Sequence, residues 1–156
     1  MKVVAISGIS GSGKTSLVKT LSHSLSCPSV LFDDFVDDQT YPKDIKKWVT
    51  NGANVIDVET PRMDKALLEL VSRSEAEYIF VEEPFGKCRE PISALIDKVV
   101  LLDMPLEICL SRVIQRNIAQ SGLDSSENIN QYLVKYNEFL RDAYIKTNMQ
   151  TRGTSD

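Results

Sequence analysis

The segment GISGSGKTS, residues 8–16, has the composition of a loop that binds phosphate groups. Gly8 to Thr15 reads G-x-x-x-x-G-K-T and lies between the apolar run KVVAIS and the amphipathic stretch LVKTLSHSL. Glycines let the backbone curl so that successive N–H groups point at phosphate oxygens, and the following helix adds the positive end of its dipole. Lys14 would reach the β- and γ-phosphates as a catalytic cation, and the Thr15 hydroxyl would bind Mg²⁺. The predicted nucleotide-binding residues here are Gly8, Ser10, Gly11, Ser12, Gly13, Lys14, Thr15 and Ser16.

Two pairs of adjacent carboxylates follow apolar runs, at positions where strands of a parallel sheet would end. LFDDF contains Asp33 and Asp34, and FVEEP contains Glu82 and Glu83. Ligands of open parallel sheets bind at this edge. One aspartate could accept the proton of an acceptor hydroxyl and the other hold a magnesium-bound water; alternatively both are turn residues or helix caps. Only one glutamate can face the cleft, because neighbouring strand residues point to opposite sides.

Three further residues have both a functional and a structural interpretation. Arg112 and Arg116 lie four residues apart, and hence on one helix face, where they could clamp the charge of a transferring phosphoryl group or simply be solvated. Trp48 could stack on a flat substrate or cover the core. We include both arginines among the predicted nucleotide-binding residues.

The pattern of apolar residues predicts the elements that position these groups. Strands are expected at KVVAIS, SVLFDD, EYIFVEE and DKVVLLD, and helices at residues 14–24, 45–49, 63–73, 105–119 and 126–146. Strands that alternate with helices indicate an α/β fold with right-handed crossovers. We therefore expect a three-layer P-loop NTPase with a short parallel sheet flanked by helices. Residues 1–156 are expected to form a single domain, in which the polar residues 146–156 are a frayed tail.

Composition excludes several classes of partner. The net charge of −4 does not favour nucleic acid or an anionic membrane surface. No apolar run approaches the roughly 20 residues that span a bilayer, and the N-terminus does not resemble an export signal. The three cysteines show no CxxC spacing, which fits reduced thiols. We expect a cytoplasmic protein with no nucleic-acid or membrane partner; the sequence does not predict an oligomeric state.

The phosphate loop by itself does not identify the phosphoryl acceptor. The N-K-x-D and D-x-x-G strings typical of GTPases are absent, as is the L-S-G-G-Q string of ABC-type ATPases. A small-metabolite kinase needs only an acidic residue near the acceptor hydroxyl and cations around the phosphoryl group. The competing hypothesis is a regulatory NTPase that hydrolyses nucleotide slowly and has no metabolite acceptor.

In several ordered segments the chain resembles the uridine kinase and nicotinamide riboside kinase group of P-loop kinases. GISGSGKTSL, FDDF, NVIDVETPRMDKALLEL, FVEEPFG and QYLVKYNEFLRDAYIKT are each similar to a segment of that group, over roughly residues 2–146. The resemblance implies a kinase that uses ATP and Mg²⁺ and phosphorylates a hydroxyl of a small metabolite, such as a nucleoside or another ribosyl compound.

The resemblance also implies roles for individual residues. By position, the catalytic aspartate is Asp33, with Asp34 beside it on the substrate side, and Asp57 matches the aspartate that holds ribose hydroxyls. Glu83 matches the glutamate of a V-x-E-G-F segment and is expected to bind substrate or, with Thr15, the metal. The late helix, similar to Y-x-x-x-V-R-P-x-Y, is matched by Tyr136, Arg141 and Tyr144, of which Arg141 is expected to bind substrate.

Overall fold

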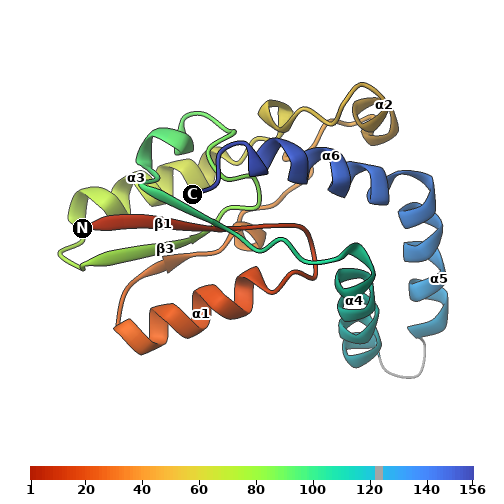
Figure 1. The fold of residues 1–156 in the computed structure, drawn as a ribbon, viewed down its shortest axis with the longest axis horizontal. Coiled ribbons are helices and arrows are strands. Elements are labelled where there is room, and N and C mark those ends of the chain that lie inside the picture. The colour runs from red at the N-terminus through yellow and green to blue at the C-terminus, as the bar shows by residue number, and fades with distance from the viewer. Residues whose placement is uncertain (122–124) are drawn as a thin grey trace.

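A parallel sheet lies at the centre of the computed structural model, which describes residues 1–121 and 125–156 (Figure 1). Its four strands lie in the order β2-β3-β1-β4. They are β1 (Lys2–Ser7), β2 (Ser29–Val30), β3 (Tyr78–Glu82) and β4 (Lys98–Leu101). All three strand pairs are parallel. The continuous apolar character of β1 and β3 follows from this arrangement, because both faces of the sheet are covered.

Helices cover both faces of the sheet. In Figure 1, α1 (Lys14–Leu25) lies on one side, and α3 (Pro61–Arg73) and α6 (Arg141–Arg152) lie on the other. The core on the α1 side is built around Ile6, Val18, Cys27 and Phe80, and the larger opposite core includes Ala5, Met63, Leu67, Val81, Val99 and Ala143. The predicted three-layer α/β fold is confirmed.

The other elements lie between the strands or follow the sheet. The remaining helices are α2 (Ile45–Thr50), α4 (Leu106–Ser121) and α5 (Ser125–Lys135), and a π-helical segment, η5 (Tyr136–Leu140), joins α5 to α6. Short 3₁₀ turns are η1 (Phe32–Asp34), η2 (Val55–Asp57) and η3 (Ile92–Leu95). In the described part of the chain, no helix is both long enough and apolar enough to cross a bilayer.

The second strand is shorter than the sequence predicts. It pairs with β3 only through Ser29 and Val30, and the chain then turns into η1. Phe32 is buried in that turn, where its ring packs edge-on against Phe85 at a centroid distance of 5.9 Å. The turn leaves Asp33 free of the sheet, at its carboxyl end.

The predicted frayed tail over residues 146–156 is wrong, because α6 continues to Arg152 and is packed. The side chains of Thr147 and Thr151 are buried, and their hydroxyls donate to carbonyls one turn earlier at 2.8 and 2.9 Å. These bonds satisfy the hydroxyls inside the helix, so a polar sequence can lie in the interior. Asp156 then pairs with Val99: its N–H donates to the carbonyl at 3.0 Å, and its carboxylate accepts from the N–H at 2.8 Å.

Gln150→Ala tests the docking of this helix. The Gln150 side chain accepts a hydrogen bond from the Val55 N–H at 3.1 Å and donates to the Ala53 carbonyl at 2.9 Å. Removing it leaves two backbone groups without these partners, so we expect the free energy of unfolding in urea to fall by about 1–2 kcal/mol. The control is Met149→Ala, at a neighbouring residue that is 69% exposed. Equal stability of the two variants would show that the segment is frayed.

Candidate active site

The phosphate loop curls at the carboxyl end of β1, as its sequence predicts. Gly11 and Gly13 have φ angles of 84° and 104°, which disfavour residues with a side chain. A Cβ at Gly11 would also collide with the backbone carbonyl of Cys109 in α4. Gly13 caps the N-terminus of α1, so the positive end of that helix dipole lies at the loop. The loop thus has the shape of an anion-binding site.

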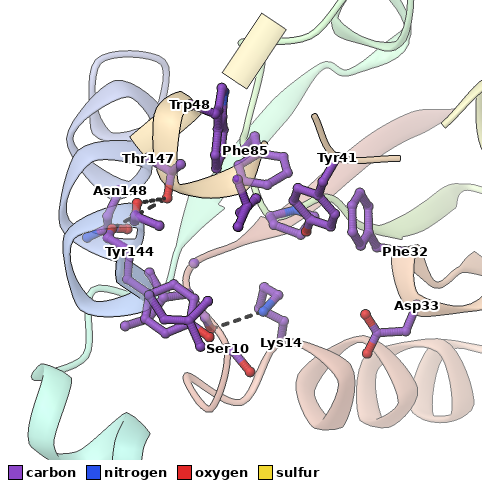
Figure 2. Close-up of a pocket in the computed structure, with 16 residues that line it drawn as sticks. Ser10, Lys14, Phe32, Asp33, Tyr41, Trp48, Phe85, Tyr144, Thr147 and Asn148 are labelled. Atoms are coloured by element: carbon purple, nitrogen blue, oxygen red, sulfur yellow. Dashed lines mark hydrogen bonds between the residues drawn. The ribbon is translucent and has the colours of Figure 1, made fainter. Parts of the chain in front are cut away.

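Lys14 is buried inside the loop that it follows. Its Nζ donates a hydrogen bond of 3.0 Å to the carbonyl of Ile9, and only 8% of the residue is exposed. Burial lowers the pKa of Lys14, and the negative charges of Glu82 and Asp33 oppose that shift. The ammonium is therefore held by the Ile9 carbonyl, and the charges of Glu82 and Asp33 act on it (Figure 2 shows Lys14 and Asp33).

The residues at the start of α1 fit a divalent cation. Thr15 Oγ1 donates to Glu82 Oε1 at 2.8 Å. Among the described residues, Glu82 Oε2 and Ser12 Oγ are buried without a hydrogen-bond partner. Burial raises the pKa of Glu82, which is the effect expected of a carboxylate that lacks full compensation. No cage of three or more His, Cys, Asp or Glu side chains occurs in residues 1–121 and 125–156; this is compatible with Mg²⁺, which usually takes one or two carboxylates together with waters and substrate phosphates.

Glu83 does not reach the phosphate loop, and this corrects the role expected of it. Its carboxylate is fully buried and accepts hydrogen bonds of 3.1 and 2.5 Å from the Arg89 guanidinium. Glu82 lies two residues after Phe80, whose side chain packs in the α1-side core, and therefore projects toward α1 and Thr15. Strand alternation leaves open which glutamate faces the cleft, the resemblance favours Glu83, and the structure instead directs Glu82 to Thr15.

A pocket of about 340 Å³ opens directly beside the loop (Figure 2). Lys14 and Asp33 are its charged lining residues. Its walls are largely apolar, include several aromatic rings, and come from segments far apart in the chain: Phe32 and Tyr41 after β2, Trp48 from α2, Phe85 after β3, and Tyr144 with Asn148 from α6. Such walls suit a flat ring, with the few polar groups setting its orientation.

The two aspartates of η1 differ in their position relative to the pocket. Both are exposed, but Asp33 lines the pocket and Asp34 does not. The charge of Asp33 acts on Lys14 and also on Tyr41, whose pKa burial and this carboxylate raise to about 12. Asp33 thus lies between the phosphate loop and the aromatic walls.

Asp57 and Arg141 are not brought to the pocket. Val55 and Val58 are buried on either side of Asp57, which turns its carboxylate to solvent at a second, open hollow. The pocket is lined along α6 by Ala143, Tyr144 and residues one turn later, so Arg141 lies on the flank of the helix and is exposed. The substrate-binding roles expected of both residues are therefore not supported by their positions.

The remaining predicted residues lie around the loop. Arg112 Nη1 is 3.4 and 3.3 Å from the carbonyls of Gly11 and Ser12, and the charge of Arg116 acts on Lys14. Arg112 therefore borders the predicted phosphate site from α4, and Arg116 follows it one turn later on the same helix. Ser16 is exposed on α1. The hydroxyl of Ser10 interacts with Tyr144, which joins the loop to α6.

Sequence reasoning missed Tyr41, Phe85 and Asn148, and it favoured packing over ligand contact for Trp48. Phe85 comes soon after β3 at the edge where ligands bind, which was an available signal, whereas Tyr41 and Trp48 lie farther along the chain from β2 and carry no such signal. Asn148 lies in the segment expected to fray, so nothing in the sequence pointed to it.

Comparison with known proteins supports the resemblance read from the sequence. No family model matches the chain. The chain is 28% identical over 175 residues to a uridine kinase of Schizosaccharomyces pombe. The alignment covers 92% of this chain and 37% of that protein. The chain thus spans little more than a third of the length of this relative. The predicted resemblance to P-loop kinases of the uridine kinase group is confirmed.

A solved structure shows the same fold. The shikimate kinase of Acinetobacter baumannii, determined with shikimate, superposes with a TM-score of 0.55 at 19% sequence identity. The match covers 99% of this chain and 80% of that one. The chain therefore has the P-loop kinase fold over nearly its whole length.

Proposed function

We propose that the protein is a kinase that transfers the γ-phosphoryl group of ATP to a hydroxyl of a small metabolite, a nucleoside or similar ribosyl compound such as uridine or nicotinamide riboside. One observation carries the proposal: an aromatic-walled pocket opens onto Lys14 of the phosphate loop, with the Asp33 carboxylate where the two meet. A phosphate chain and a flat-ringed acceptor would then meet at these two side chains.

The donor side would be formed by the loop and α4. Backbone N–H groups from Gly11 to Thr15 would bind the β- and γ-phosphates, and Lys14 would neutralise the charge that builds up during transfer. Arg112 borders the same site, and together with Arg116, whose charge acts on Lys14, it would hold the outer phosphate oxygens. Lys14 is already fixed by its bond to Ile9, so little reorganisation is needed.

The acceptor side would be formed by the pocket. Its aromatic walls would hold the ring so that the reacting hydroxyl lies next to Asp33. That hydroxyl oxygen attacks the γ-phosphorus, the bond from the γ-phosphorus to the β–γ bridging oxygen breaks, and the hydroxyl proton passes to the Asp33 carboxylate. Thr15 and Glu82 would hold Mg²⁺, which when bound supplies neutralising charge to the phosphates.

The test is ADP release from ATP and Mg²⁺, measured with and without a panel of nucleosides and sugars. We expect ADP release to depend strongly on one class of acceptor. Slow release that no acceptor changes would contradict the proposal and favour a regulatory NTPase.

Glu82→Gln tests the assignment of the metal ligands. The variant keeps the size of the side chain but removes the negative charge beside Thr15. We expect the Mg²⁺ concentration that gives half-maximal activity to rise about 10- to 100-fold, with a smaller change in activity at saturating Mg²⁺. The matched control is Glu75→Gln, at an exposed residue before β3. An unchanged Mg²⁺ requirement would remove Glu82 from the metal site.

A further inference from the structure

Arg89 is buried behind the pocket together with Glu83. The residue is only 2% exposed and does not line the pocket, and its partner carboxylate is fully buried. The guanidinium donates to both oxygens of that carboxylate, through Nε and Nη2. Taking two charges out of water costs free energy that their attraction often does not recover, so a buried ion pair is weak evidence for stability. Neither stability nor the proposed phosphoryl transfer accounts for this pair.

The guanidinium joins segments that lie far apart in the sequence. Glu83 directly follows β3. On the other side, Arg89 Nη1 donates to the Val58 carbonyl at 3.1 Å and to the Thr60 hydroxyl at 3.0 Å, in the segment between η2 and α3. The N–H groups of arginine form a rigid planar fork, so bonds to several partners at once fix their relative positions.

Two walls of the pocket contact this guanidinium. Its central carbon lies 5.4 Å from the ring centroid of Phe32 and 5.8 Å from that of Phe85, and the two rings pack edge-on against each other. A cation over an aromatic ring is attracted to it, and more strongly where water is excluded. Both rings line the pocket, and Phe32 directly precedes Asp33 in the turn η1 (Figure 2). The place of Arg89 therefore sets that of two rings and, through Phe32, that of the Asp33 carboxylate.

The contacts of Arg89 are confined to the acceptor side of the site. Among the described residues, its side chain has no hydrogen bond, ion pair or ring contact with residues 8–16 of the phosphate loop. We infer that Arg89, held by Glu83, is a positioning residue for the acceptor: it fixes the two rings that orient the acceptor and the carboxylate that takes its proton. This inference rests on the proposed kinase function. Changes at Arg89 are therefore expected to weaken use of the acceptor and to leave ATP binding intact.

The first test is Arg89→Lys, which keeps the positive charge but replaces the fork by a single ammonium group. Lysine cannot hold Glu83, Val58 and Thr60 in the same geometry. We expect kcat/KM for uridine and nicotinamide riboside to fall about 10- to 100-fold, through a higher KM and a lower kcat, because small misplacements of reacting groups have effects of this size. The Kd of ATP should stay near its wild-type value. The control is Arg73→Lys, at an exposed residue at the end of α3.

The second test removes both charges at once, in the double variant Glu83→Gln/Arg89→Met. Loss of one partner would leave a buried charge unpaired, whereas loss of both does not, so the fold should be kept. Glutamine also keeps an acceptor for the Phe85 N–H, from which Glu83 Oε1 accepts at 3.2 Å. We again expect a lower kcat/KM for the nucleosides at an unchanged Kd of ATP. The matched control is Glu69→Gln/Lys65→Met, the same kind of exchange in an exposed ion pair of α3.

The outcomes separate this inference from the function on which it rests. Melting temperature shows which variants are folded. A folded variant of either kind with wild-type kcat and KM for the nucleosides overturns the inference and leaves the kinase proposal standing. A rise in the Kd of ATP as large as that in the nucleoside KM, or failure of both variants to fold, shows that the pair is only structural and overturns it too.

If the wild-type protein phosphorylates neither nucleoside, the inference and the nucleoside-kinase proposal fail together. A loss confined to the nucleoside side in a folded variant, with both controls normal, identifies Arg89 as the residue that positions the acceptor half of the site.

Discussion

Asp33→Asn is expected to lower kcat by roughly 10²- to 10⁴-fold, because asparagine keeps the size of the side chain but cannot accept the hydroxyl proton. The affinity for ATP should change little, since the phosphate loop is untouched. Asp33 lines the pocket and acts electrostatically on Lys14, which places it where the acceptor hydroxyl and the phosphate chain would meet. The measurement is kcat together with the nucleotide Kd, both at saturating Mg²⁺.

The matched control is Asp34→Asn, at the neighbouring residue of the same turn. Asp34 is exposed and does not line the pocket, so its variant should keep most of the activity. An inactive Asp34 variant beside an active Asp33 variant would reverse the assignment of the base. If both stay active, neither carboxylate accepts the proton and the kinase proposal weakens.

Lys14→Met is expected to lower kcat by about 10²- to 10³-fold, the usual cost of removing one preorganised charge from a transition state. The stability of the protein should not fall. Burial already lowers the pKa of Lys14, which shows that the site disfavours its charge, and methionine is an apolar side chain of similar length. The measurements are kcat and the melting temperature of the ligand-free protein.

Lys19→Met provides the control on the same helix, at an exposed residue on the surface of α1. It should leave both kcat and the melting temperature near their wild-type values. Normal turnover by a folded Lys14→Met variant would contradict the nucleotide-site assignment, whereas loss of the fold would give Lys14 a structural role.

The phosphate loop could be predicted from the sequence because its information is local. The glycines, Lys14 and Thr15 are contiguous, and the strand before and the helix after them are recognisable from their own residues. The same locality explains why the α/β fold could be predicted: buried parallel strands form apolar runs, and the helices between them are amphipathic.

The acceptor pocket could not be predicted in this way, because its walls are assembled from distant segments. Tyr41, Phe85 and Tyr144 meet only after α6 has packed across the loops at the sheet edge. That packing depends on threonines whose hydroxyls are satisfied within the helix, a feature that composition alone assigns to an exposed tail. An interpretation by polarity therefore ends the helix too early and leaves Asn148 in the tail.

The choice between neighbouring carboxylates required the sheet itself. Alternation along β3 shows that Glu82 and Glu83 point to opposite faces, but not which face carries α1. The position of Phe80 in the α1-side core answers that question and assigns Glu82 to Thr15. The outward position of Asp57 has a related origin: the burial of its neighbours Val55 and Val58 directs it away from the pocket, and a match of sequence letters contains no information on direction.

The most direct test of the central claim follows the phosphorus atom itself. Protein is incubated with Mg²⁺ and ATP labelled at the γ-phosphate, with and without uridine, and the label is traced among ATP, inorganic phosphate and nucleoside. We predict that label appears in a phosphorylated nucleoside in equal amount to the ADP formed, and that Asp33→Asn abolishes this transfer. Label that appears only as inorganic phosphate, at the same rate with and without nucleosides or other ribosyl acceptors, would contradict the account.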